Sequence, residues 1–165
     1  MANNPPVLIS SGSLDASFGG DGLTSTAIDA GSDQARGIAI QSDGRYVVAG
    51  WSDTGGGNYD FAVLRFNADG SLDSSFSGDG KQTTSIAAGT FADKAYGVAI
   101  QSDGKIVLAG STNNGTNDDF AIVRYNTNGS LDASSGLSTY IASKGYRDFT
   151  TEGKKLSNGG WVLGE

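Results

Sequence analysis

The chain has no cysteine and no histidine among its 165 residues. This absence excludes a disulfide framework, metal sites that need thiolate or imidazole ligands, and catalytic units built on histidine. Positive charge is also scarce, because 11 lysines and arginines stand against 18 acids and the net charge is −7. The few cations form no basic stripe interleaved with aromatic residues, so we expect no nucleic-acid partner.

Long apolar runs are missing as well. The stretch IVLA at residues 106–109 is among the longest, and it is far too short to cross a bilayer. The amino end, MANNPP, lacks the basic and apolar regions of a secretory signal. We therefore expect a soluble chain without a membrane partner, whose localisation the sequence leaves unknown. Proline is rare (2 residues) and glycine is abundant (26 residues), which is typical of a chain with many tight turns.

One unit is written three times along the chain. Residues 12–22 (GSLDASFGGDG) return at 70–80 (GSLDSSFSGDG), and their first half returns at 129–134 (GSLDAS), so the period is 58 and then 59. Residues 39–50 match 99–110, and residues 60–67 match 119–126. The third copy is degraded, but its segment LSNGGWVLG at 156–164 aligns with IQSDG at 100–104 of the second copy and the apolar run after it. Self-similarity at a fixed period indicates a repeat architecture.

Each copy is predicted to contain four strands. In the first copy they are Leu23–Ile28, Arg36–Gln41, Tyr46–Ala49 and Phe61–Phe66. The triplet Ser-Asp-Gly predicts a hairpin turn in which Gly44 or Gly104 supplies a positive φ. The last two strands are apolar at successive positions, as expected of strands covered on both faces. The protein is therefore predicted to be all-β.

A four-stranded antiparallel sheet repeated at this period is typical of the blades of a β-propeller. Propellers usually have four to eight blades, whereas the chain has material for three. We therefore predict a homodimer that forms a six-bladed ring, with three blades per chain and an exchanged terminal strand that pairs every sheet edge. The alternative is a monomer with internal pseudo-threefold symmetry, such as a β-prism or a trefoil.

The predicted domain is a single repeat domain spanning residues 1–165. Blade one is assigned to residues 11–69 and blade two to residues 70–128. Blade three is assigned to residues 129–165 and lacks its fourth strand. Residues 7–10 (VLIS) stand where the last strand of a full copy would be, so they are predicted to complete blade three of the partner.

The quoted motifs, GSLDxSF, QSDGKIVLAG and DFAIVRYNxxGSLD, resemble the bacterial delta-60 repeat family. The resemblance covers roughly residues 7–164, and in the third copy Ser135 and its neighbours replace the Phe-containing stretch. It implies a propeller-like fold. Members of that family are mostly secreted or surface proteins, and the family supplies no catalytic residues to transfer.

The loop between the third and fourth predicted strands differs between copies and is the candidate ligand site. Such polar, Gly-rich loops carrying an aromatic residue are common sugar-contacting surfaces. The alternative is a solvated hairpin loop with Trp51 packed on the next sheet. The candidate ligand-binding residues are Trp51, Asp53, Tyr59, Asn113 and Asn117.

A second loop places oxygen side chains at alternate positions, as at the start of a calcium loop. The candidate metal ligands are Asn67, Asp69, Ser71 and Asp73. The alternative is that these residues cap turns through local backbone bonds. Calcium is the one metal considered, and no other cofactor is expected.

Arg65 and Arg124 end strands that are otherwise apolar. We expect them to pair with an acid such as Asp60 or Asp119 of a neighbouring unit, or to extend to solvent.

These observations predict a non-catalytic propeller that acts as a binding or structural module, with carbohydrate as the candidate ligand. A purely architectural protein whose only partner is itself is the first alternative. A glycoside hydrolase is the second, although no pair of acids with the two required roles can be chosen from the sequence.

Overall fold

The computed structural model describes residues 12–86 and 92–132, together with the strands at 153–155 and 161–163. The predicted terminal strand at residues 7–10 and most of the third copy lie outside the described residues. Every regular element of the described part is a β-strand. The strands are β1 (Asp33–Ile40), β2 (Tyr46–Asp53), β3 (Tyr59–Phe66), β4 (Lys81–Thr84), β5 (Asp93–Ile100), β6 (Ile106–Asn113), β7 (Asp118–Tyr125), β8 (Gly153–Lys155) and β9 (Trp161–Leu163). The all-β prediction is confirmed.

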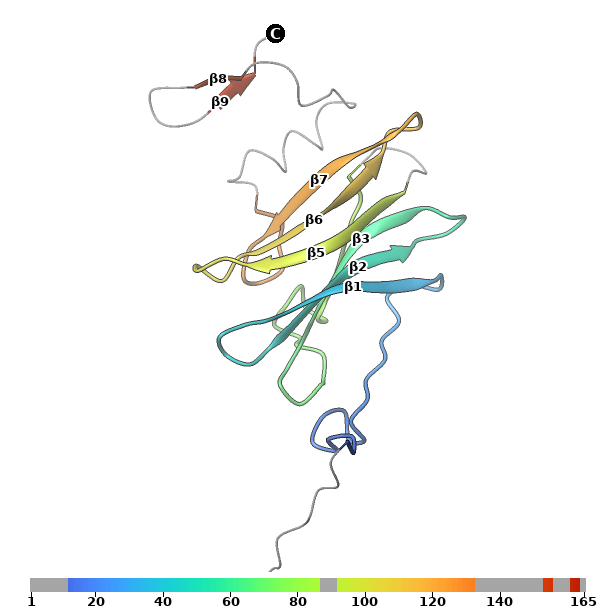
Figure 1. Ribbon diagram of the computed structural model, residues 1–165, viewed down its shortest axis with the longest axis vertical. Helices are drawn as coiled ribbons and strands as arrows, with labels where there is room; N and C mark the ends of the chain where they lie inside the picture. Colours follow the sequence, from blue (N-terminus) through green and yellow to red (C-terminus); the bar gives the residue numbers. More distant parts are fainter. Residues whose placement is uncertain (1–11, 87–91, 133–152, 156–160, 164–165) are drawn as a thin grey trace, which may run out of the picture.

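The first sheet has four antiparallel strands in the order β1-β2-β3-β4. Figure 1 shows β1, β2 and β3 side by side. Strand β4 is the Thr-containing segment of the second copy, and it pairs with β3 from Phe61 opposite Thr84 to Leu64 opposite Lys81. The sequence predicts this segment as the first strand of its own sheet, and that grouping is wrong. The sheet spans residues 33–84 and crosses the predicted boundary at residues 69 and 70, because the second repeat supplies the closing strand of the sheet before it.

The segment Leu23–Ile28, which is predicted to be a strand, has no strand structure. Its equivalent in the second copy, β4, forms by pairing with the strand that precedes it in the chain, β3. The counterpart of β3 for Leu23–Ile28 is the stretch at residues 7–10, outside the described residues. A strand forms ladder bonds only with a neighbouring strand, and among the described residues no strand pairs with Leu23–Ile28.

The second sheet repeats the first with strands β5-β6-β7. Ile38 lies opposite Val48 in one sheet, and Val98 lies opposite Leu108 in the other. A register shift follows Ala35 in the first sheet and Ala95 in the second. A β-bulge bends a strand and increases its twist, so both sheets carry the same local distortion at the same place.

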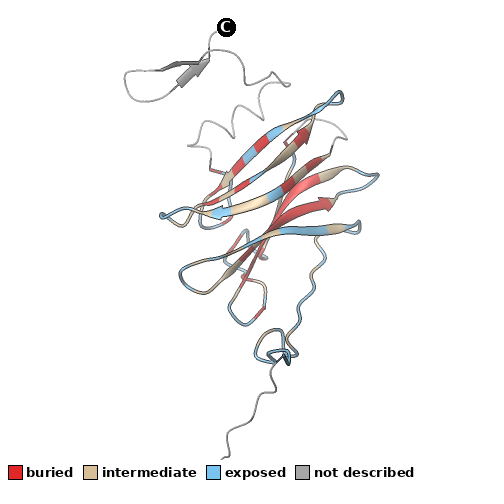
Figure 2. Ribbon diagram, viewed as in Figure 1, coloured by how far each residue is buried: buried red, intermediate tan, exposed pale blue. Residues whose placement is uncertain are grey.

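The two sheets stack face to face, and the core lies between them. The face of the first sheet that carries Val47, Ala49, Phe61 and Val63 packs on the face of the second sheet that carries Ile106, Leu108, Val123 and Tyr125. Figure 2 shows buried residues along β2 and β3, and buried residues alternating with more exposed ones along β6 and β7. Because side chains alternate along a strand, each sheet also has a second face that points away from this core.

The described residues form two stacked sheets and a short hairpin, and they form no closed ring. Antiparallel pairing of all strands agrees with the predicted blade type. Among the residues that the structure describes, no helix has the length and apolar character needed to span a membrane.

Candidate functional site

The turn that follows β3 carries a buried ion pair. Arg65, at the end of β3, donates from Nε to Oδ2 of Asp73 at 2.7 Å, and both side chains are 7% exposed. Arg45, from the first hairpin, places its Nε 3.0 Å from the same oxygen. Burial by itself would raise the pKa of Asp73, but hydrogen bonds from Ser75 and the charge of Arg65 outweigh it, so the pKa lies below its ordinary value. Asp73 is therefore a charged anchor for two arginines.

The same turn joins the two repeats. Phe76 is fully buried, with the Arg65 guanidinium 4.8 Å from its ring centre. The Arg65 Nη1 donates to the carbonyl of Thr127 at 2.5 Å, and the backbone N of Ser77 donates to the carbonyl of Asn128 at 2.9 Å. The turn after β3 thus packs directly on the turn after β7 in the next repeat. We call this contact the repeat joint.

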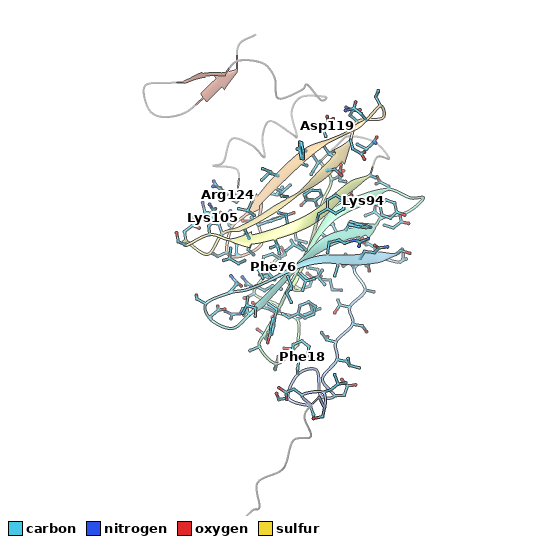
Figure 3. The ribbon with its side chains drawn as sticks, in the orientation of Figure 1. Phe18, Phe76, Lys94, Lys105, Asp119 and Arg124 are labelled. Atoms are coloured by element: carbon cyan, nitrogen blue, oxygen red, sulfur yellow. The ribbon has the colours of Figure 1, made fainter. Side chains whose placement is uncertain are left out.

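The second repeat builds the same ion pair in a more open setting. Arg124 and Lys105 both donate to Oδ2 of Asp132, at 2.8 and 2.9 Å (Figure 3). Their side chains are 28% and 27% exposed, whereas that of Asp132 is 4% exposed. The difference from Arg65 arises because Thr127 and Phe76 cover Arg65 at the repeat joint.

These pairs correct the sequence prediction for the two arginines. Acidic partners are expected and found, but they are Asp73 and Asp132 rather than Asp60 and Asp119. Asp60 lies near the start of β3, at the opposite end from Arg65, and its side chain points to the opposite face of the sheet. The turn after β3 instead brings Leu72 back beside Phe66. The acid that follows this turn is therefore the one within reach.

The candidate calcium loop has the bonding of a turn. Asp69 accepts bonds from the backbone N and hydroxyl of Ser71 at 3.0 and 2.6 Å, and these bonds lower its pKa. Asn67 donates from its amide to the Ser71 hydroxyl at 3.0 Å. In the second copy the uncharged Asn128 accepts the equivalent bonds from Ser130, at 3.1 and 2.8 Å. The turn therefore forms without a negative charge at this position.

Among the described residues, no group of three or more acidic side chains is arranged to hold a metal ion. The fourth candidate ligand, Asp73, already pairs with two arginines. The structure does not test calcium binding by this loop, but the bonding described above favours the turn-capping alternative.

Trp51 lies at the interface between the sheets and is 5% exposed. The Arg36 guanidinium is 4.5 Å from its ring centre and the Lys94 ammonium is 5.4 Å from it, at cation–π distances. Tyr96 packs edge-on at 5.6 Å. This packing on the next repeat is the alternative that the sequence left open, and it leaves little of the ring accessible to a ligand.

The other candidate ligand residues lie at the loop ends of two hairpins, β2–β3 in the first sheet and β6–β7 in the second. Tyr59 is half-buried, and the Lys94 ammonium lies 4.6 Å from its ring centre. Asp53 accepts bonds from the backbone N of Gly55 and of Gly57 at 2.9 and 3.2 Å. Lys94 thus brings Tyr59 together with Trp51.

In the second sheet, Asn113 bonds to Asp118 at 2.6 Å and Asn117 bonds to Asp119 at 3.0 Å. These two residues are held within their own hairpin.

Two further buried acids have environments that the sequence did not predict, and the first, Asp93, was not singled out at all. Asp93 is fully buried and accepts bonds from the Thr112 hydroxyl at 2.5 Å and from the backbone N of Ile86 at 2.6 Å. Asp60 is 8% exposed, and burial raises its pKa. The recurrence of an acid at the start of β1 and β5, Asp33 and Asp93, is the signal that could have identified the first of these positions.

Two segments of the chain, residues 41–76 and 101–134, match the family described as "Domain of unknown function (DUF5122) beta-propeller". Each segment runs from the Ser-Asp-Gly hairpin through two strands into the turn that carries the ion pair. The match supports a propeller-like repeat of unknown function. No curated protein matches the chain.

Proposed function

We propose that this chain is a non-catalytic, propeller-type module whose role is assembly or binding, and that a second copy completes the ring. The observation that carries the proposal is the back face of the first sheet, the face opposite the core, which includes Ile38, Ile40, Val48 and Leu64. Ile38 and Ile40 are 64% and 66% exposed. Their equivalents in the second repeat, Val98 and Ile100, pack against the core between the sheets.

The interface between the two sheets therefore indicates what kind of surface would cover the back face. In the second repeat, the equivalent face is covered by the core-facing side of the repeat before it. On the first sheet, the back face borders a groove of about 540 Å³, which residues Thr24, Thr26 and Ile28 line from the other side. An apolar face of this kind is typical of an interaction surface, and another repeat fits it by analogy with the interface already present.

Three repeats are fewer than the four to eight blades of a propeller. The proposal assigns the remaining repeats to a second copy, so that a homodimer forms a six-bladed ring with residues 7–10 exchanged between chains. In the alternative, a pseudo-threefold monomer, the third repeat of the same chain covers the back face. The resemblance to the delta-60 repeat supports either arrangement and belongs to the same proposal.

Molar mass in solution, measured by light scattering, distinguishes these arrangements. We expect twice the chain mass for the wild type. Ile38→Lys should give the single-chain mass, because a charge on the back face would be buried without a partner. Ile38→Val introduces the residue that the second repeat has at this position, so it should keep the dimer. A wild-type protein with the mass of one chain would contradict the homodimer.

The bonding of the recurrent acids supports the absence of catalysis. Asp73 and Asp132 each pair with two cations, and Asp15 and Asp69 accept bonds from the serine two residues later. Glycoside hydrolysis generally uses two carboxylates in distinct protonation states on either side of the bond. Release of reducing sugar by the purified protein from any of a panel of glycosides would refute the non-catalytic assignment.

Carbohydrate binding at the hairpin tips is the second candidate. It is supported by the half-buried ring of Tyr59, held beside Lys94, next to the polar loop that begins at Asp53. A glycan array followed by titration should then show binding that Tyr59→Ala abolishes and that Tyr46→Ala, a change at the opposite end of β2, retains. An array without a response would remove carbohydrate as the candidate ligand.

A further inference from the structure

The second sheet has an apolar face that points away from the core. We call it the outer face, and it includes Ala109, Phe120 and Ile122. Phe120 is 91% exposed and Ile122 is 47% exposed. An exposed phenylalanine beside an exposed isoleucine on neighbouring rungs of one strand forms a contiguous apolar surface, which is a mark of an interaction site.

The equivalent residues of the first sheet show what such a face does. Phe61 and Val63 occupy the positions of Phe120 and Ile122, and both are fully buried against the second repeat. Ala49, the equivalent of Ala109, is also fully buried. The exposed residues are therefore a second copy of a surface that already packs on the following repeat.

The polar part of the contact shows the same difference. Arg65 donates across the repeat joint to the carbonyl of Thr127. Arg124 is its equivalent, and its side chain is 28% exposed, against 7% for Arg65. A repeat placed on the outer face would cover Arg124 in the way that the second repeat covers Arg65.

The repeat that follows the second one is the third repeat of the same chain. Its hairpin β8–β9 pairs Lys155 with Trp161, with five residues between them. Strands β5 and β6 pair Ile100 with Ile106 at the same separation. By this register, Trp161 and Leu163 correspond to Ile106 and Leu108, which are fully buried against the first sheet. The third repeat thus has the hairpin that makes this contact.

We propose that the outer face of the β5–β7 sheet binds the third repeat of the same chain, residues 133–165, through the hairpin β8–β9. The inference rests on the proposed function, because it extends the stacking of repeats by one. Covalent attachment favours this occupant over a second molecule, since the third repeat follows Asp132 directly and has a high effective concentration at the face.

Disulfide trapping tests the proposal, and the chain offers a clean background because it has no cysteine. In the interface already described, a Cβ at Gly37 would lie 3.4 Å from the backbone N of Val98 and 3.5 Å from Cα of Gly97. The pair Gly37→Cys with Val98→Cys is therefore the control. The equivalent pair one repeat later is Gly97→Cys with Gly153→Cys. At present a Cβ at Gly97 would meet no described atom within 4 Å.

After mild oxidation of the full chain at low concentration, non-reducing gels and peptide mass mapping would report the links. We expect both pairs to form a disulfide within a single chain, to a similar extent. A test pair that stays reduced while the control oxidises would overturn the proposal. A test pair that links two chains would also overturn it and would assign the outer face to a second copy.

A substitution provides an independent readout. Phe120→Ser should lower the urea midpoint and speed proteolysis within residues 133–165, because it removes apolar surface that the third repeat buries. Leu14→Ser, which changes a residue that is 60% exposed, should leave both unchanged. If Phe120→Ser leaves both unchanged, the outer face is not covered. Failure of the dimer would appear in the molar mass and would leave these results unaffected, so the two proposals can fail separately.

Discussion

The buried pair between Arg65 and Asp73 yields the sharpest prediction about stability. Asp73→Asn keeps an oxygen that can accept the two bonds from Ser75, but it removes the charge that faces Arg65. The Arg65 side chain is 7% exposed and cannot regain water where it lies. Removing one partner of a buried ion pair leaves an uncompensated charge, so we expect a loss of about 3–5 kcal/mol in the free energy of unfolding.

Asp69→Asn is the matched control. It makes the same change in a neighbouring turn of the same kind, in which the acid accepts bonds from Ser71 and pairs with no arginine in the described residues. Asn128 already occupies the equivalent position in the second copy. We therefore expect Asp69→Asn to unfold at the wild-type urea midpoint. Both variants should be measured at one protein concentration, because assembly makes stability concentration-dependent.

The pH dependence provides a second check on the same pair. The pKa of Asp73 is lower in the folded protein than its ordinary value, so the folded state favours the charged form. Its contribution to stability is fully present above the unfolded pKa of about 3.9 and is lost as the pH falls through the folded pKa. The difference between wild type and Asp73→Asn should therefore shrink below about pH 4. Equal midpoints for Asp73→Asn and Asp69→Asn at pH 7 would refute this reasoning.

Three further predictions concern the repeat joint, the core and the candidate calcium loop. Gly129→Ala should lower the melting temperature more than Gly78→Ala does. The backbone strain is similar, because φ is +88° at Gly129 and +90° at Gly78, but only the new Cβ at position 129 would lie 2.9 Å from the backbone N of Ser77. Tyr125→Phe should cost about 1 kcal/mol in urea unfolding by removing the bond to the Thr84 hydroxyl, a typical value for one hydrogen bond, and an unchanged midpoint would contradict it. Added calcium should not shift the melting temperature of wild type or of Asp69→Asn, and a rise confined to the wild type would show that the loop binds the ion.

Local patterns were sufficient to predict the strands that form hairpins. Strand β2 begins at Tyr46 and strand β3 ends at Phe66, as their apolar runs predict, and the Ser-Asp-Gly turn precedes β2 at the predicted place. The pairing of strands across repeats was not predictable in the same way. Strand β4 is separated from β3 by a long turn, so its Thr-rich sequence fits either neighbouring sheet and periodicity does not choose between them.

The candidate ligand residues show the same limit. The sequence marked Trp51 as the aromatic residue in a variable loop, and it left open whether that ring faces solvent or the next sheet. The answer depends on Lys94 and Tyr96, which belong to the next repeat and reach Trp51 only once the two sheets stack. The exposure of Trp51 therefore depends on two segments that are distant in the sequence, and neither segment alone predicts it.

By itself, the sequence determined the all-β class, the repeat and its hairpins, because these depend on residues close together in the chain. Only the tertiary structure decided which acid pairs with Arg65, which sheet β4 completes and which apolar faces are buried. Those outcomes follow from the stacking of one sheet on the next. Phe61 and Phe120 occupy equivalent positions in two copies of one motif, yet the first is buried and the second is exposed, because only the first faces another described repeat.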